Sequence, residues 1–471
     1  MASPVADSYS ALAGVPVYGG RFPGGALYGD AALSDVLAFG GMGEQVSGLS
    51  GDATLSSILA GGLIAQAMEP RTAMIGDSLT THLLGYNWSP FFWINGVAAS
   101  GGQQLIANAG VSGDTIGQML SRVNNSYTSG SPGLSGLSPL GVVYFRGGTN
   151  DARAGTALAS LTGTYTSLLN AIKGYCEHVV ILSVPPIGST EASFATKNAL
   201  TIEYSDWLET FAAANPADFT YVDDSANLRD GGGAQLAGYF QSDGIHNAPR
   251  ATYIEGNDAA TALTTLFSGY GYTSPVSSDA ADVYPAQPQW VPNHVMAGTG
   301  GSVGSGMTGQ VADSWSIGAN GGGITATLSK VAADGGDPNQ TPWQRVAPTQ
   351  VTRTGAGESI RITTSLSGRT ITTSDPSALD VVVELRFNAF QATYFSSLLL
   401  WVQGNTGDAL TADVELKTAE TITKTIVLRH KMPRPTTVSQ SSATLYFDAV
   451  IGANNTGAMG SFDFRCLTIR G

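Results

Sequence analysis

Residues 73–86 read AMIGDSLTTHLLGY, and the interpretation of the whole chain depends on this stretch. An apolar run predicts a short buried strand, and the triplet Gly-Asp-Ser at 76–78 ends it before a helix-like segment. The chain has 60 glycines, and Gly-Asp also occurs at 29–30 and 51–52. Those two dipeptides follow no clear apolar strand and precede no serine. The triplet alone therefore does not make Ser78 a nucleophile, and the rest of the sequence must decide.

The region around this triplet alternates strand-like and helix-like segments. Apolar strands are predicted at 72–76, 104–108, 141–147, 178–184 and 219–223. Between them, apolar residues recur at helical spacing, most clearly over 116–123, 158–172 and 200–211. This alternation predicts a parallel sheet covered by helices on both faces. Ligands of such sheets bind beyond the C-terminal ends of the strands, so the chemistry is expected there.

The N-terminal segment, residues 1–68, is rich in Gly, Ala, Ser and Leu and contains an internal repeat. Residues 25–41 are echoed by residues 47–62. Two copies are too few for a solenoid that buries its own faces. We expect a segment that attaches or oligomerises the protein, with a loosely structured extension as the alternative. Residues 271–292, rich in Pro, Ser and Ala, are interpreted as the linker that follows a domain at 69–270.

The C-terminal region, residues 293–471, has the pattern of a β-domain. Residues 381–387, VVVELRF, alternate between two faces, and several similar strands follow with turn residues between them. This spacing predicts an antiparallel β-sandwich of the jelly-roll kind. Four tryptophans lie at or within its limits: Trp290, Trp315, Trp343 and Trp401. They suit ring stacking on carbohydrate, or they fill the core of the sandwich, and both interpretations stay open.

Polar residues recur where the predicted strands end. Gly113 precedes the predicted helix opened by Asp114-Thr115, and Asn150 follows the third strand in RGGTNDA. Near the end of the region, Asp243 precedes His246 by three residues. A serine hydroxyl needs a base to remove its proton, and the imidazole needs a carboxylate to orient it. The tetrahedral intermediate needs donors for its oxyanion, so these residue types together point to acyl transfer.

These blocks resemble the SGNH/GDSL hydrolase family over about residues 70–268. The resemblance implies a flavodoxin-like three-layer α/β/α domain that needs no metal or cofactor. It also implies that Ser78 is the nucleophile and that His246 is the general base and then the general acid. Asp243 orients this histidine. The oxyanion hole combines the Ser78 N–H with Gly113 and Asn150.

Two other residues compete for catalytic roles. His82 lies four residues after Ser78, where a helix places both on one face, but no carboxylate follows it at a suitable spacing. We expect it to line the cleft. Ser302 lies in GGSVG at 300–304, which matches the Gly-x-Ser-x-Gly elbow, but the segment is a glycine-rich loop. The remaining histidines are expected to be structural or at the surface: His178, His294 and His430.

Composition limits the possible partners. Charged residues make up 12% of the 471 residues and the formal net charge is −14, which disfavours nucleic acid and anionic membrane surfaces. No run reaches the roughly 18 apolar residues of a membrane span, and no signal peptide is recognisable at the start. Cys176 and Cys466 are far apart and form no disulfide framework.

The expected function is that of a serine esterase, most specifically a carbohydrate O-acetylesterase acting on a bacterial surface polysaccharide. The glycine-rich, weakly charged flanks resemble bacteriophage tail or spike proteins. We therefore expect a homo-oligomer, with a trimer as one form, that is made in the cytoplasm and acts in a virion or outside the cell, with tail proteins as partners. One alternative is a free-standing esterase or lipase on small or lipid esters. The other is an inactive glycan-binding adhesin.

Overall fold

The computed structural model describes most of the sequence beyond residue 70. The described residues are 71–81, 89–98, 102–267, 291–334, 341–366, 378–404, 409–416, 418–433 and 443–470. The protein divides into two units, Met1–Ala67 and Met68–Gly471, and all described residues belong to the second. The expected N-terminal segment and most of the expected linker lie outside the described residues.

Five strands form a parallel sheet in the order β2-β1-β3-β4-β5. They are β1 (Arg71–Gly76), β2 (Gln104–Gly110), β3 (Leu140–Arg146), β4 (Cys176–Leu182) and β5 (Phe219–Val222). All seven residues of the central strand β3 are buried, which explains its continuous apolar sequence. This order is that of flavodoxin-like folds, so the predicted α/β class is confirmed. Its switch point lies between β1 and β3.

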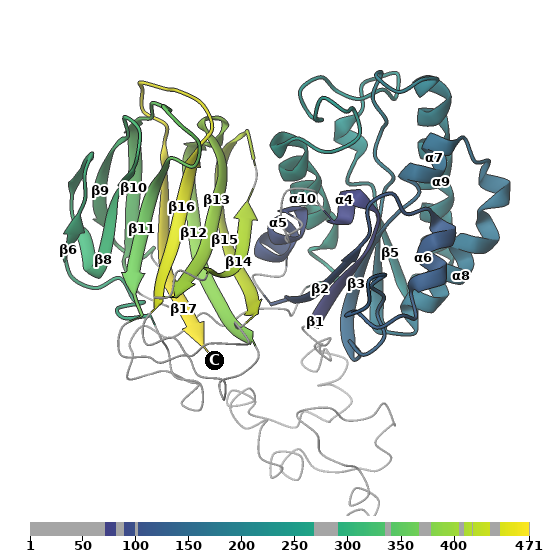
Figure 1. Ribbon diagram of the computed structural model, residues 1–471, viewed down its shortest axis with the longest axis horizontal. Coiled ribbons are helices and arrows are strands. Elements are labelled where there is room, and N and C mark those ends of the chain that lie inside the picture. Colours follow the sequence, from purple (N-terminus) through teal and green to yellow (C-terminus); the bar gives the residue numbers. More distant parts are fainter. Residues whose placement is uncertain are drawn as a thin grey trace, which may run out of the picture. The chain divides into compact units, whose positions relative to one another are not determined.

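Helices cover both faces of this sheet (Figure 1). One face packs against α6 (Ile116–Arg122), α8 (Thr162–Lys173) and α9 (Phe194–Ala214). The other packs against α5 (Ser89–Ala98) and α10 (Pro249–Leu263). Two short helices, α4 (Ser78–Thr81) and α7 (Thr149–Ala154), begin just beyond the ends of β1 and β3.

Helix α5 has no counterpart in the sequence prediction, because its apolar run is too short for a membrane span and shows no other clear pattern. Four consecutive residues, Phe91 to Ile94, are fully buried, so the helix is apolar on every side and lacks an amphipathic period. The Trp93 ring lies 4.9 Å from the ring of Tyr253 in α10 and 6.2 Å from the ring of Phe387. No helix among the described residues is long and apolar enough to cross a membrane.

Residues beyond 299 form two six-stranded sheets that face each other (Figure 1). One sheet has the order β15-β12-β17-β10-β9-β7 and the other β14-β13-β16-β11-β8-β6. The strands are β6 (Gly300–Val303), β7 (Met307–Gly309), β8 (Val311–Asn320), β9 (Thr325–Val331), β10 (Trp343–Gln350), β11 (Ser359–Ser365), β12 (Ala378–Gln391), β13 (Phe395–Gly404), β14 (Ala409–Leu416), β15 (Thr421–Pro433), β16 (Ala443–Ile451) and β17 (Ser461–Arg470). The predicted antiparallel sheets are confirmed, except that the edge strands β6 and β7 pair in parallel with β8 and β9.

The tryptophans of the sandwich differ in their surroundings. Trp315 and Trp343 are only 2% and 1% exposed, so neither ring is available to a sugar. Trp401 is half-buried, and its neighbours Leu400 and Val402 point into the core. Because side chains alternate along a strand, Trp401 stands on the outer face of β13, stacked on the Tyr446 ring at 4.0 Å. Trp290 lies outside the described residues.

Candidate active site

The predicted site residues lie beyond the C-terminal ends of neighbouring strands. Ser78 is the first residue of α4, directly beyond β1. Gly113 follows β2, and Asn150 lies in the first turn of α7 beyond β3. The site therefore spans the switch point between β1 and β3, where ligands of this fold class bind. His246 precedes α10, in the segment that follows β5.

The structure brings Ser78, His246 and Asp243 together in one hydrogen-bonded line. His246 Nε2 lies 2.9 Å from Ser78 Oγ, and His246 Nδ1 lies 2.6 Å from Asp243 Oδ2. Partial burial opposes ionisation of Asp243, but hydrogen bonds from the ring and backbone of His246 outweigh it and keep the pKa of this carboxyl below its usual value. In the expected catalytic arrangement, an ionised Asp243 accepts from Nδ1–H, and Nε2 is then the nitrogen that accepts the serine proton.

A tight turn presents the histidine. Asp243 Oδ1 accepts hydrogen bonds from the backbone N–H groups of Ile245 and His246, at 2.9 and 3.0 Å. The Gln241 N–H donates to the His246 carbonyl at 2.7 Å and closes the turn. The carbonyl of Gly244 accepts from the Gly188 N–H, also at 2.7 Å, which fixes the turn to the segment after β4. Hydrogen bonds thus fix both the N–H and the carbonyl of His246, and this fixed backbone sets the position of the imidazole.

The two expected oxyanion donors other than the Ser78 N–H come from separate segments, Gly113 from the turn after β2 and Asn150 from the first turn of α7. Gly113 is exposed, and its φ of +86° lies in the left-handed region, which is strained for a residue that carries a side chain. Asn150 Nδ2 donates to the carbonyl of Asp114 at 2.9 Å. Because an amide carries two N–H donors, this bond fixes the orientation of the group and leaves one N–H for an oxyanion.

Helix α6 begins where the sequence predicted. It starts at Ile116, with Thr115 as the N-cap in a capping box with Gln118. The first helical N–H, that of Ile116, donates to Asp151 Oδ2 at 3.0 Å. Asp151 follows Asn150, so this bond connects the segment after β3 to helix α6, which follows β2.

Strand β1 can extend to the C-terminal edge of the sheet only because it ends in a glycine, Gly76. A Cβ on Gly76 would lie 2.1 Å from Thr80 Oγ1 and 2.3 Å from the Arg146 carbonyl. Both distances are far below van der Waals contact. Glycine at this position lets β1 approach β3 and start α4 at once, which places Ser78 at the rim.

A buried charge cluster that sequence reasoning missed lies beside the site. Arg146, at the end of β3, pairs with Asp224 and Glu255, and all three side chains are at most 1% exposed. Burial raises the pKa of both carboxyls, although Arg146 opposes the shift. Glu255 Oε2 also accepts a 2.5 Å hydrogen bond from Asn247, the neighbour of His246. The only indication of this cluster in the sequence was Arg146, a charged residue at the end of an apolar strand.

Asp77, beside the nucleophile, is also fully buried. Its Oδ1 accepts from the Leu79 N–H at 3.0 Å, and its Oδ2 has no hydrogen-bond partner among the described residues. Burial raises the pKa of Asp77 from 3.8 to about 6, against the lowering effects of the Leu79 N–H and the Arg146 charge.

The competing residues lie away from this geometry or outside the described residues. His82 is not among the described residues, and neither is the side chain of His430. Ser302 lies on strand β6, so no strand–turn–helix elbow surrounds it. His178 and His294 are buried, and His178 Nε2 lies 2.9 Å from Thr220 Oγ1. Within the described ranges, no three His, Cys, Asp or Glu side chains gather as metal ligands.

A family match indicates a hydrolase, and the hydrogen-bonded line of Ser78, His246 and Asp243 is the candidate catalytic arrangement. Residues 74–250 match the family model described as the GDSL-like Lipase/Acylhydrolase family. No match was found among the curated proteins.

Several solved structures are similar to part of this chain. A member of the lipolytic protein G-D-S-L family from Veillonella parvula DSM 2008 is 16% identical, with a TM-score of 0.33 and coverage of 41% of this chain and 98% of that chain. A GDSL-like lipase from Bacteroides thetaiotaomicron VPI-5482 is 18% identical, with a TM-score of 0.31 and coverage of 45% and 97%. The enzymatically active domain of tailspike protein 4 from bacteriophage CBA120 is 11% identical, with a TM-score of 0.23 and coverage of 33% and 19%.

Proposed function

We propose that the protein is a serine esterase that works through an acyl-enzyme intermediate on Ser78. The 2.9 Å contact between Ser78 Oγ and His246 Nε2 carries this proposal. His246 takes the serine proton as Oγ attacks the ester carbonyl, and the Ser78 N–H, Gly113 and Asn150 receive the oxyanion. The imidazolium then protonates the leaving alcohol. In the second half, His246 activates water, and hydrolysis of the acyl group restores Ser78.

We further propose that the substrate is an O-acetyl group on a bacterial surface polysaccharide. The support comes from the half-buried Trp401, which stands on the outer face of the sandwich with Tyr446 stacked on it. Arg361 lies 5.1 Å above the Tyr446 ring and 5.6 Å from that of Trp401. Stacked aromatic rings on an outer face suit contact with the hydroxyl-rich rings of a polysaccharide, while the Arg361 charge itself is paired with Asp448.

Acetate release from O-acetylated capsules and O-antigens tests the substrate, with Ser78→Ala as the control. We expect release by the native protein and none by the variant. A p-nitrophenyl ester series tests the alternative of a free-standing esterase or lipase on small or lipid esters. This alternative predicts turnover of the simple esters with no release from any polymer, and a lipase also predicts faster turnover of long acyl chains. An absence of Ser78-dependent turnover on every ester would instead favour the adhesin.

A virion-associated homo-oligomer, trimeric or otherwise, remains part of the proposal, with tail proteins as its partners. Its support is the glycine-rich, weakly charged sequence, in which only 12% of residues are charged. Light scattering on the full-length protein and on a variant lacking residues 1–68 tests the oligomer. A monomer in both cases contradicts it. Tail genes beside the coding sequence would support the virion assignment, and their absence would count against it.

A further inference from the structure

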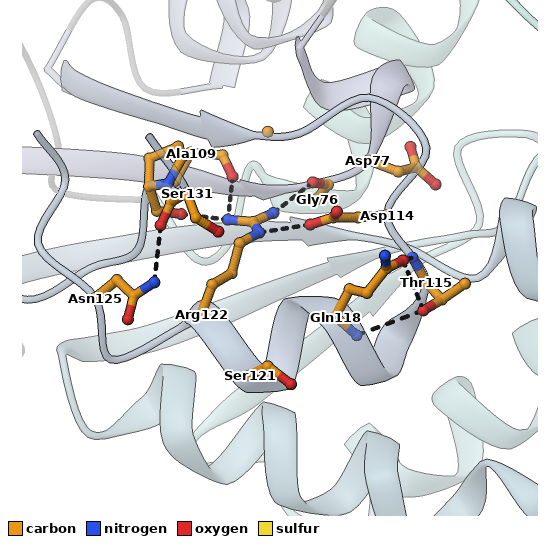
Figure 2. Close-up of polar contacts among 12 residues, drawn as sticks. Gly76, Asp77, Ala109, Asp114, Thr115, Gln118, Ser121, Arg122, Asn125 and Ser131 are labelled. Atoms are coloured by element: carbon orange, nitrogen blue, oxygen red, sulfur yellow. Dashed lines mark hydrogen bonds and ion pairs between the residues drawn. The ribbon is translucent and has the colours of Figure 1, made fainter. Parts of the chain in front are cut away.

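Arg122 is a buried cation that the proposed chemistry does not use. It lies in the last turn of α6 and is 3% exposed. Its guanidinium faces the ends of β1 and β2 rather than solvent (Figure 2). A buried charge without partners is very costly, so the groups that Arg122 binds determine where this side chain is stable.

Three of the four partners of Arg122 among the described residues lie close in sequence to the candidate catalytic groups, and the fourth, Pro132, lies in the segment after α6. Arg122 Nη2 donates to the Gly76 carbonyl at 2.9 Å, two residues before Ser78. Arg122 Nη1 donates to the Ala109 carbonyl in β2 at 2.8 Å and also to the carbonyl of Pro132. Arg122 Nε donates to Asp114 Oδ2 at 2.5 Å, beside Gly113 (Figure 2).

Asp114 extends this set of contacts to Asn150, in the first turn of α7. Its carboxylate binds Arg122, while its own backbone carbonyl accepts the 2.9 Å hydrogen bond from Asn150 Nδ2. Asp114 is 7% exposed, so both interactions are shielded from water. One continuous series of contacts therefore joins the nucleophile strand, the Gly113 turn and the Asn150 amide.

We propose that Arg122 and Asp114 are a positioning pair that sets the spacing of the oxyanion donors around Ser78. This role rests on the proposed acyl-transfer function. Oxyanion donors are effective only when their positions are fixed before charge develops, within about 0.5 Å of the productive geometry. Gly113 lies in the turn after β2 and Asn150 in the first turn of the short helix α7, and Arg122, together with Asp114, connects both to β1 and β2.

An arginine is required because its planar fork offers five donors in fixed directions. A lysine keeps the charge but has one nitrogen, which cannot bind Gly76, Ala109 and Asp114 with the same geometry. Loosened donors weaken binding of the transition state more than binding of the substrate. The change therefore lowers kcat and leaves KM nearly constant.

The test compares Arg122→Lys with Arg345→Lys in the full-length protein. Arg345 is the control: it pairs with the buried Asp463 in the sandwich at 2.8 and 2.9 Å, is itself 31% exposed, and lies away from the catalytic groups. The measurements are kcat and KM on p-nitrophenyl acetate, inhibition by phenylboronic acid, which forms a tetrahedral adduct with a serine, and the melting temperature. Asp114→Asn is the second variant, because it keeps the side-chain shape and the backbone carbonyl.

For Arg122→Lys we expect kcat to fall about 10- to 100-fold, less than for outright loss of a donor, and boronate affinity to fall by a similar factor. KM should stay within about twofold, and Asp114→Asn should show the same split with a smaller change. Arg345→Lys should lower only the melting temperature. Unchanged kcat and boronate affinity in folded Arg122→Lys or Asp114→Asn would overturn the positioning role. Absence of Ser78-dependent turnover in the native protein would overturn the proposed function itself.

Discussion

Arginine side chains have different kinds of partner in the two described regions. In the α/β region, Arg122 binds backbone carbonyls at strand ends, and Arg146 binds carboxylates from two further segments. In the sandwich, Arg345 and Arg361 each bind a carboxylate on the neighbouring strand, Asp463 and Asp448. The first kind of pair joins loops that carry chemistry, whereas the second joins strands that are already paired. Similar arginine interactions therefore have different consequences. They position functional groups in the α/β region and reinforce existing strand pairing in the sandwich.

The two regions also share one apolar core. A single buried cluster runs from Met74 of β1 through α5 to the inner faces of both sandwich sheets. On α10, Arg250 pairs with Glu420 and Asn257 accepts a hydrogen bond from Lys424, so polar contacts border this junction. We therefore expect the two regions to unfold together.

The largest expected effect on stability concerns Trp93, at the centre of this junction. Trp93→Ala removes a fully buried ring that contacts both α10 and β12, so the free energy of unfolding should fall by about 3–5 kcal/mol. Urea denaturation followed by circular dichroism measures this. Trp401→Ala, which removes a half-buried ring from the outer face, is the matched control and should cost less. A loss below about 1 kcal/mol for Trp93→Ala would mean that the regions do not depend on a shared core.

A smaller effect, confined to activity, is expected at Asn150. Asn150→Ala removes one oxyanion donor, so kcat should fall about 10²- to 10³-fold while KM changes little. Steady-state kinetics on p-nitrophenyl acetate measures this. Gln403→Ala on strand β13 of the sandwich is a control that should leave kcat unchanged. A fall in KM and kcat by equal factors would argue against the oxyanion role.

The smallest effect is a pH dependence at Asp77. Burial raises the pKa of Asp77 from 3.8 to about 6, so the folded protein binds this proton more tightly than the unfolded protein does. The resulting stabilisation is complete below the unfolded pKa and is lost as pH rises through about 6. Asp77→Asn stays neutral, so its stability relative to the native protein should rise over this interval by up to about 3 kcal/mol.

Denaturation midpoints of both proteins on either side of this interval provide the measurement. A stability difference that stays constant, or that moves in favour of the native protein as pH rises, would contradict the raised pKa. Asp258→Asn, whose carboxylate binds Asn227 at the surface of α10, is the control for a change of charge alone.

The sequence was sufficient to predict the five parallel strands and the residues at their ends, because each strand is apolar and ends in a polar block. It was not sufficient for α5, whose burial on every side removes the amphipathic period that marks a helix. The roles of Arg122 and Arg146 were also missed. Their acceptors, such as the Gly76 carbonyl and Glu255, lie 46 and 109 residues away in the sequence, so only the fold brings them together.

The central claim is that Ser78 Oγ becomes the acyl carrier when His246 accepts its proton. Mass spectrometry of peptides after treatment with a fluorophosphonate tests this directly, because the reagent labels only serines that are activated in this way. We predict one adduct, on the peptide that contains Ser78, and a strongly reduced rate of labelling in His246→Ala. Ester hydrolysis without any adduct on Ser78, or labelling that does not depend on His246, would contradict the account.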